Sequence, residues 1–119
     1  MPLSDFLNID LSAQAEDLAG EVHKVYQRTR LAGKNAAVDR LLRRLDDLSK
    51  HLKEAKEGRS PQKTRSCLES ALRCLHECIP LLDLCLKKVL VSKELHQRWT
   101  QWLGRMGEGV ETWKDGTRT

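Results

Sequence analysis

The segment SPQKTRSCLESALRCLHECIPLLDLCLKKVL, residues 60–90, decides the fold class of this chain. Its leucines recur at spacings of three and four residues, which is the period of an amphipathic α-helix and not of a strand. Ser60 and Pro61 are typical of a helix start, because the hydroxyl caps the first turn and proline loses no hydrogen bond there. The segment therefore predicts one long helix over residues 61–91.

A proline interrupts this predicted helix. Pro80 has no N–H to donate to the carbonyl of His76, and its ring crowds the preceding turn. We expect a kink at this position or a break into two pieces, and we interpret Pro80 as a conformational hinge.

All four cysteines of the chain lie in the same segment, at Cys67, Cys74, Cys78 and Cys85. Their spacing returns each one to nearly the same angle on a helix, so they form a single stripe. Residues seven apart on a helix lie about 10 Å from each other, beyond the reach of a disulfide. His76 points to the opposite face, which leaves a zinc site short of ligands. We predict reduced thiols packed as small apolar side chains, with no metal and no cofactor.

Three other segments repeat the helical pattern of apolar residues. Asn35 and Ser92 are suitable N-caps, and Gly33 and Gly58 are suitable ends. The predicted helices span residues 12–32, 35–57, 61–91 and 93–113, followed by a disordered tail over 114–119. The prefix Leu3, Phe6, Leu7 and Ile9 is placed to close one end as a short extra helix. Helices of this length with short links predict an all-α, up-down-up-down four-helix bundle.

The length and composition fit one soluble domain. A chain of 119 residues can bury a single core without disulfides. The N-terminus lacks the basic and apolar regions of a signal peptide, and no apolar run approaches the roughly 18 residues of a membrane span. We therefore expect a cytoplasmic protein, peripheral at membranes if it meets them.

No catalytic pattern accompanies these helices. The chain has no G-x-S-x-G sequence, no phosphate-binding glycine loop and no pairing of nucleophile, base and orienting acid. Its carboxylates stand beside basic residues at helical spacing, as on a solvated surface. We predict a protein that is not an enzyme.

The positive charge is concentrated in residues 33–66, which hold 10 basic and 5 acidic residues. Two interpretations stay open, because the same residues suit either an ion-paired surface helix or contact with an anionic membrane. Nucleic acid is the weakest option, since no aromatic or recognition-helix pattern accompanies the charge.

The layout of LAGEVHKVYQRTRLAGKN, LLRRLDDLSKHL, CLHECIPLL and ELHQRWTQWLGRM resembles a known domain type. It is similar to the N-terminal four-helix bundle of the mixed lineage kinase domain-like pseudokinase, to fungal HeLo domains and to the bundle of plant helper immune receptors. The resemblance covers roughly residues 11–113 and rests on helix lengths and apolar spacing.

This resemblance implies a signalling module of cell death or innate immunity that self-associates and binds or permeabilises anionic phospholipid membranes. The runner-up is an adaptor bundle that binds a signalling protein and never meets lipid. The early acidic residues of the chain oppose attraction to lipid. The positions that match the lipid-binding basic residues of those relatives are Arg28, Arg30 and Lys34, with Arg40, Arg43 and Arg44 as second candidates.

Overall fold

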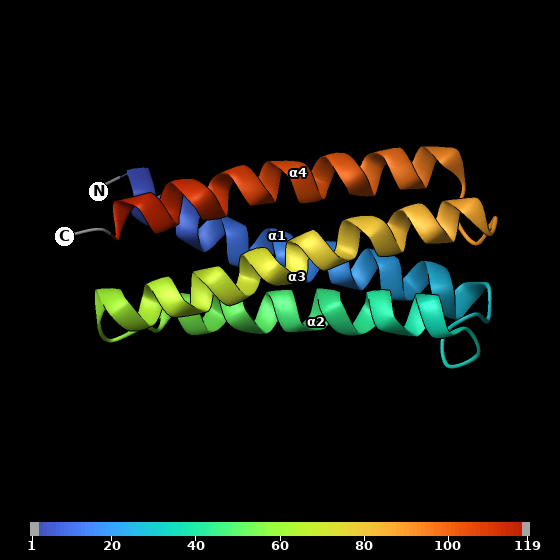
Figure 1. Cartoon of the computed structure of the whole chain (residues 1–119), viewed down its shortest axis with the longest axis horizontal. Helices are drawn as coiled ribbons and strands as arrows, with labels where there is room; N and C mark the ends of the chain where they lie inside the picture. The colour runs from blue at the N-terminus through green and yellow to red at the C-terminus, as the bar shows by residue number, and fades with distance from the viewer. Residues whose placement is uncertain (1–2, 118–119) are drawn as a thin grey trace.

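The computed structural model describes the backbone of residues 3–117 and the side chains of residues 11–117. In order along the chain, its helices are α1 (Leu3–Arg28), α2 (Ala36–Lys56), α3 (Pro61–Lys87) and α4 (Lys93–Gly116). Each helix packs against the next one, and α4 packs against α1 (Figure 1). Successive helices run in opposite directions, which confirms the predicted up-down-up-down four-helix bundle.

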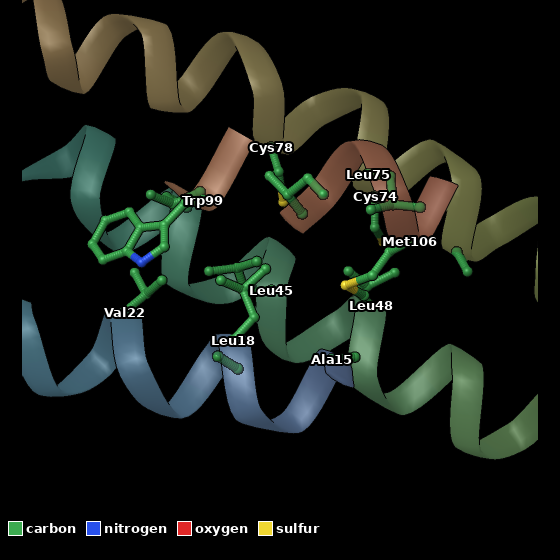
Figure 2. Packing of buried hydrophobic residues seen from close by; sticks show 14 of the residues in the cluster. Ala15, Leu18, Val22, Leu45, Leu48, Cys74, Leu75, Cys78, Trp99 and Met106 are labelled. Carbon is green, nitrogen blue, oxygen red and sulfur yellow. The ribbon is translucent and has the colours of Figure 1, made fainter. Parts of the chain in front are cut away.

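The core runs along the whole bundle axis and consists of the predicted apolar stripes. Leucines of α2 such as Leu45 and Leu48 are buried against Leu18 of α1 and Leu75 of α3 (Figure 2). Burying a leucine of this kind contributes about 1.5–3 kcal/mol relative to leaving it exposed. The 3.6-residue period of each segment thus places its apolar face inward, and the four faces meet in one core.

The predicted caps hold three of the helix starts. The Asn35 side chain accepts hydrogen bonds from the amides of Ala37 and Val38, and the Ser60 hydroxyl accepts one from Lys63 at 3.1 Å. Ser92 does the same for Leu95 at the start of α4. These bonds satisfy amides of the first turn that have no partner inside the helix.

The first helix begins earlier and ends earlier in the sequence than the predicted residues 12–32. Residues 3–10 continue directly into α1, so they do not form a separate short helix, and their side chains lie outside the described part. The helix ends at Arg28 instead of residue 32, because the amides of Arg30 and Leu31 turn back to carbonyls of its last turn. This ending leaves residues 29–35 as a link, in which Leu31 and Ala32 pack against the core while Arg30 and Lys34 are exposed.

Helix α3 passes through Pro80 without a break. Of the two expected alternatives, the break into two pieces is therefore excluded, and the kink and the hinge stay predictions. The helix tolerates the proline because only the bond from residue 80 to His76 is missing, while apolar residues on both sides, such as Cys78 and Leu82, are buried. It ends at Lys87, four residues before the predicted boundary.

The last helix extends to Gly116, so residues 114–116 are not the disordered tail that the sequence predicts. Trp113 is buried and anchors this final turn, and the Thr117 amide donates to the carbonyl of Lys114 at 3.1 Å. Residues 118 and 119 lie outside the described residues.

Glu21 of α1 links this helix to α4 through side-chain hydrogen bonds. Its carboxylate accepts two hydrogen bonds of 2.9 Å from the Arg98 guanidinium and one of 2.6 Å from the Trp99 indole N–H. Trp99 is fully buried, and its ring centroid lies 6.1 Å from that of Tyr26 on α1. One carboxylate therefore satisfies a buried donor and joins the two helices that are farthest apart in sequence.

Two glycines of α4 differ in their surroundings, and this difference is testable. A Cβ at Gly109 would lie 2.8 Å from Leu11 Cδ2, whereas one at Gly104 would meet no atom within 4 Å. Gly104→Ala is expected to raise the free energy of unfolding by about 1 kcal/mol, the usual gain of alanine over glycine in a helix. Gly109→Ala is expected to be less stable than Gly104→Ala by at least about 1 kcal/mol, because Leu11 must move. Urea unfolding of both variants measures the difference, and equal stabilities would contradict this packing.

Candidate functional site

Two turns lie together at one end of the bundle. The α1–α2 link and the α3–α4 link share this end because α1 and α3 run in the same direction (Figure 1). The molecule measures 45 × 23 × 20 Å along its principal axes, so the end is a small face. We call it the basic end and define it by six exposed cations: Arg28, Arg30, Lys34, Lys87, Lys88 and Lys93.

The first three of these cations are the lipid-binding candidates that the resemblance implies. Arg28, Arg30 and Lys34 are exposed, and none forms an ion pair with a carboxylate among the side chains of residues 11–117. The nearby Asp39 instead accepts the backbone N–H of Gly33 at 2.7 Å. The positive charge of this link is therefore available to an anionic partner.

The other three cations were not among the sequence-derived candidates. Lys87, Lys88 and Lys93 are about 60 residues away in sequence, outside the basic segment 33–66, and only the antiparallel arrangement brings them to the same end. Each is exposed and has no ion pair in the part of the chain that the structure describes. The local charge of the end thus exceeds what either link provides.

Helices α1 and α3, whose C-termini lie at the basic end, terminate with the same pattern of backbone hydrogen bonds. After α3 the Leu90 amide donates to the carbonyl of Cys85 and the Val89 amide to that of Leu86, which is the Schellman pattern. After α1 the Leu31 amide donates to the carbonyl of Tyr26 and the Arg30 amide to that of Gln27, which is the same pattern. In this pattern one residue takes a left-handed conformation, usually glycine, but here the residues are Arg30 at φ 61° and Val89 at φ 59°.

Val89 is the less expected of the two. A left-handed conformation costs an L-residue about 1–2 kcal/mol, and a β-branched side chain is a clear outlier there. Its side chain is also 86% exposed, and it is the one large apolar side chain so exposed in residues 11–117. Val89 therefore combines backbone strain with exposure, directly after Lys87 and Lys88.

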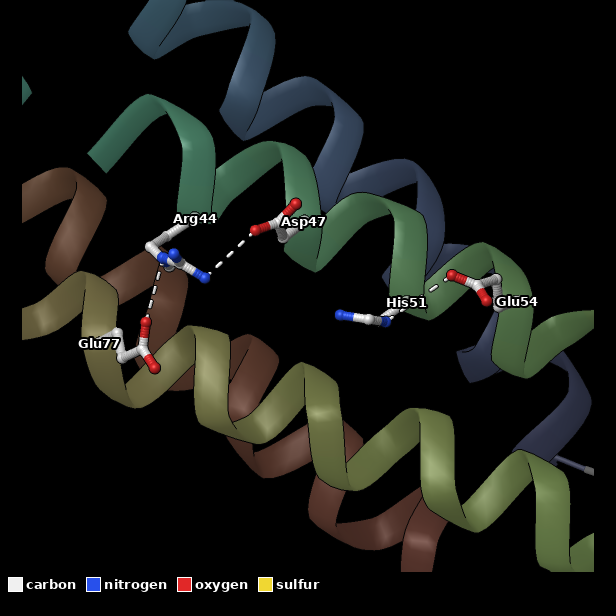
Figure 3. Close-up of polar contacts among 5 residues, drawn as sticks. All are labelled: Arg44, Asp47, His51, Glu54 and Glu77. Atoms are coloured by element: carbon white, nitrogen blue, oxygen red, sulfur yellow. Dashed lines mark hydrogen bonds and ion pairs between the residues drawn. The ribbon is translucent and has the colours of Figure 1, made fainter. Parts of the chain in front are cut away.

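The second group of candidates, Arg40, Arg43 and Arg44, contains residues with and without an ion pair among the described side chains. Arg40 and Arg43 are exposed and have no ion pair among the described side chains, whereas Arg44 contacts Asp47 at 3.2 Å and Glu77 of α3 at 3.1 Å (Figure 3). Arg44 thus joins α2 to α3, as an ion-paired surface helix would. Contact of Arg40 and Arg43 with an anionic membrane stays a prediction.

A shallow groove lies beside this ion pair, between α2 and α3. It has a volume of about 540 Å³, and Pro80 and Arg40 line it together with the half-buried Leu81 and Leu84. The hinge candidate and two of the basic candidates, Arg40 and Arg44, therefore meet at one surface. Glu77 also lines the groove, which therefore combines apolar side chains with charges of both signs.

The cysteine stripe is part of the core. Cys74, Cys78 and Cys85 are buried, Cys67 is half-buried, and all four are free thiols, as predicted. Burial raises the pKa of each thiol, that of Cys78 to about 12, so thiolate character is suppressed. His76 is exposed and faces away from them.

The described residues contain neither a cluster of metal ligands nor a membrane-spanning helix. No group of three or more histidine, cysteine, aspartate or glutamate side chains there could hold a metal ion. No helix in this part of the chain is both long and apolar enough to cross a bilayer.

Comparison with known proteins gives one structural relative. No family model matches the chain, and no curated protein matches it. The crystal structure of a protein of unknown function from the S23 ribosomal protein family of Bacteroides thetaiotaomicron is similar, with a TM-score of 0.83. The match covers 92% of this chain and 98% of that one at 13% sequence identity. At this identity the likeness shows a shared fold alone.

Proposed function

We propose that this chain is a non-enzymatic signalling module that binds anionic membranes through its basic end, self-associates there and permeabilises them. The observation that carries the proposal is the group of six exposed cations on one small face, which form no ion pair with the side chains of residues 11–117. Each basic residue near an anionic bilayer contributes about 1 kcal/mol of attraction. A role in cell death or innate immunity, at the cytoplasmic side of a membrane, belongs to the same proposal and is supported by the resemblance of the helix pattern.

The mechanism would use local opening of the bundle after binding. The hinge candidate Pro80 lacks one helix hydrogen bond, and Gly104 and Gly107 lower the helix propensity of α4. Opening at either place would expose apolar stripes to lipid or to the helices of a second copy. Binding, in this scheme, precedes self-association and leakage.

The expected result is binding to phosphatidylserine vesicles that depends on the basic end. Reversing Arg28, Arg30 and Lys34 to glutamate is expected to weaken binding at least about a hundredfold, since three cations contribute about 3 kcal/mol. Cosedimentation with vesicles measures the affinity, and release of a trapped dye measures permeabilisation. Vesicles of phosphatidylcholine alone are expected to give neither signal.

A matched control lies at the opposite end of the bundle. Lys56, Arg59 and Lys63 are also exposed, and they have no ion pair in the described residues. Their reversal to glutamate changes the net charge by the same amount and is expected to weaken binding much less. Equal losses in both triple variants would mean that only net charge matters, and a wild-type chain that neither binds nor leaks would refute the proposal.

The groove between α2 and α3 favours a second candidate function. A protein-interaction bundle would use it to receive an apolar side chain beside Pro80 and Leu84, with a neighbouring carboxylate against Arg40. This adaptor function requires no lipid. Absence of vesicle binding and of leakage in the experiment above would favour it over the membrane module.

A further inference from the structure

We propose that Val89 is an apolar anchor that inserts end-on into the interface of an anionic bilayer, while Lys87 and Lys88 bind the headgroups beside it. This inference rests on the membrane-binding function proposed above and assigns a role to a turn that the sequence candidates do not include. The evidence for it comes from exposure, backbone conformation and charge at one residue triplet.

Among the three apolar residues that follow Lys88, only Val89 is exposed. The residues that follow it are covered, since Leu90 is half-buried and Val91 is buried. The chain therefore turns its next two apolar side chains toward the bundle and leaves Val89 at 86% exposure. A polar residue would cost the folded protein nothing at such a position.

The backbone conformation makes the choice of valine still less favourable for folding. At φ 59° glycine or asparagine is the usual residue, and a β-branched side chain is the least suitable. Neither the strained backbone of Val89 nor its exposed apolar side chain stabilises the folded protein. Strained residues of this kind concentrate at binding sites, where the surrounding structure holds them in place.

The charges around Val89 indicate what it meets. Lys87 and Lys88 precede it directly, and the α1–α2 link, whose start and interior carry Arg28, Arg30 and Lys34, shares the same end of the bundle with the α3–α4 link (Figure 1). Long basic side chains can reach phosphate groups while an apolar neighbour enters more deeply. A lipid interface offers both environments within a few ångströms of each other.

A protein partner fits this surface less well. A stable protein interface buries roughly 800 Å² on each partner around an apolar centre. The described part of the basic end offers one large exposed apolar side chain, that of Val89, together with six exposed cations, on an end face of about 23 × 20 Å. Insertion of a single apolar side chain next to several cations suits a bilayer surface, which adapts to any shape.

The test separates apolar insertion from charge. Val89→Asn keeps every cation and suits the left-handed backbone, so the thermal midpoint is expected to stay equal or to rise. Binding to phosphatidylserine vesicles is expected to fall at least about tenfold, because two methyl groups no longer leave water. Val89→Leu keeps an apolar side chain and is expected to bind as tightly as the wild type. Cosedimentation at one fixed ionic strength measures all three proteins.

Insertion can also be observed directly. The native Trp99 and Trp113 are buried and Trp102 is half-buried, so a Val89→Trp variant adds a fully exposed indole at the tip. Its additional fluorescence is expected to be quenched by lipids brominated along the acyl chain, and the quenching is expected to exceed that of the wild type.

The outcomes distinguish this inference from the proposed function. If Val89→Asn binds like the wild type while the Arg28, Arg30 and Lys34 reversal does not bind, the anchor is refuted and the electrostatic function stands. If the wild type binds no vesicles, both are refuted. If Val89→Asn instead dissolves a dimer that forms without lipid, the occupant of this surface is a second copy of the chain, and the bilayer assignment is overturned.

Discussion

Replacing Trp99 with alanine is expected to lower the free energy of unfolding by about 3–5 kcal/mol, the cost of removing a large buried aromatic side chain. Trp99 has no exposed surface, contacts the ring of Tyr26, and donates its indole N–H to Glu21. The variant would leave a cavity at the contact of α1 with α4. Urea unfolding followed by circular dichroism measures the loss without relying on tryptophan fluorescence.

Trp102 provides a matched control in the same helix. It is only half-buried, and its ring lies 5.4 Å from the Arg98 guanidinium. A cation–π contact near the surface contributes about 0.5–1 kcal/mol, so Trp102→Ala is expected to cost about 1 kcal/mol. Similar losses in the two variants would contradict the difference between the full burial of Trp99 and the partial burial of Trp102.

The second large effect is expected at Glu21. Glu21→Ala leaves the buried indole N–H of Trp99 without an acceptor and separates Arg98 from its carboxylate. The expected loss is about 2–3 kcal/mol, since leaving a buried donor unpaired costs about 1–3 kcal/mol. Glu16→Ala, which removes only the exposed pair with Lys53, is expected to cost less than about 1 kcal/mol. A loss as small as that of Glu16→Ala would mean that the Glu21 contacts do not fasten α1 to α4.

The contribution of Glu21 should depend on pH in a defined direction. Hydrogen bonds from Arg98 hold the pKa of Glu21 below its ordinary value of 4.5, Trp99 lowers it further, and burial opposes them. A carboxyl whose pKa is lowered by folding stabilises the protein fully above the unfolded value. The stability difference between the wild type and Glu21→Ala is therefore expected to be largest near neutral pH and to shrink below about pH 4.5. A difference that grows in acid would show that the ionised form is not the stabilising one.

Most of the fold could be predicted from local sequence. Ser60 with Pro61, Asn35 and Ser92 determine helix starts because capping involves only residues within one turn. The burial of Cys74, Cys78 and Cys85 follows from helical spacing alone. The ends of α1 and α3 were less predictable, because Arg30 and Val89 take a conformation that glycine usually supplies.

The candidate site could be predicted only in part. Arg28, Arg30 and Lys34 are neighbours in sequence, and their exposure follows from their place at the end of α1 and in the link after it. The pairing of Arg44 with Glu77, by contrast, depends on how α2 and α3 are aligned along their axes. No periodicity within one helix specifies that alignment.

The amino-acid sequence by itself determined four amphipathic helices, their caps, the buried cysteine stripe and the bundle class, because each depends on interactions within a few turns of one helix. Only the tertiary structure decided that Glu21 satisfies Trp99 across 78 residues and that Lys87, Lys88 and Val89 join Arg28 at one end. The physical reason is that these relations depend on the direction and axial alignment of separate helices, which many side chains settle together when the core packs.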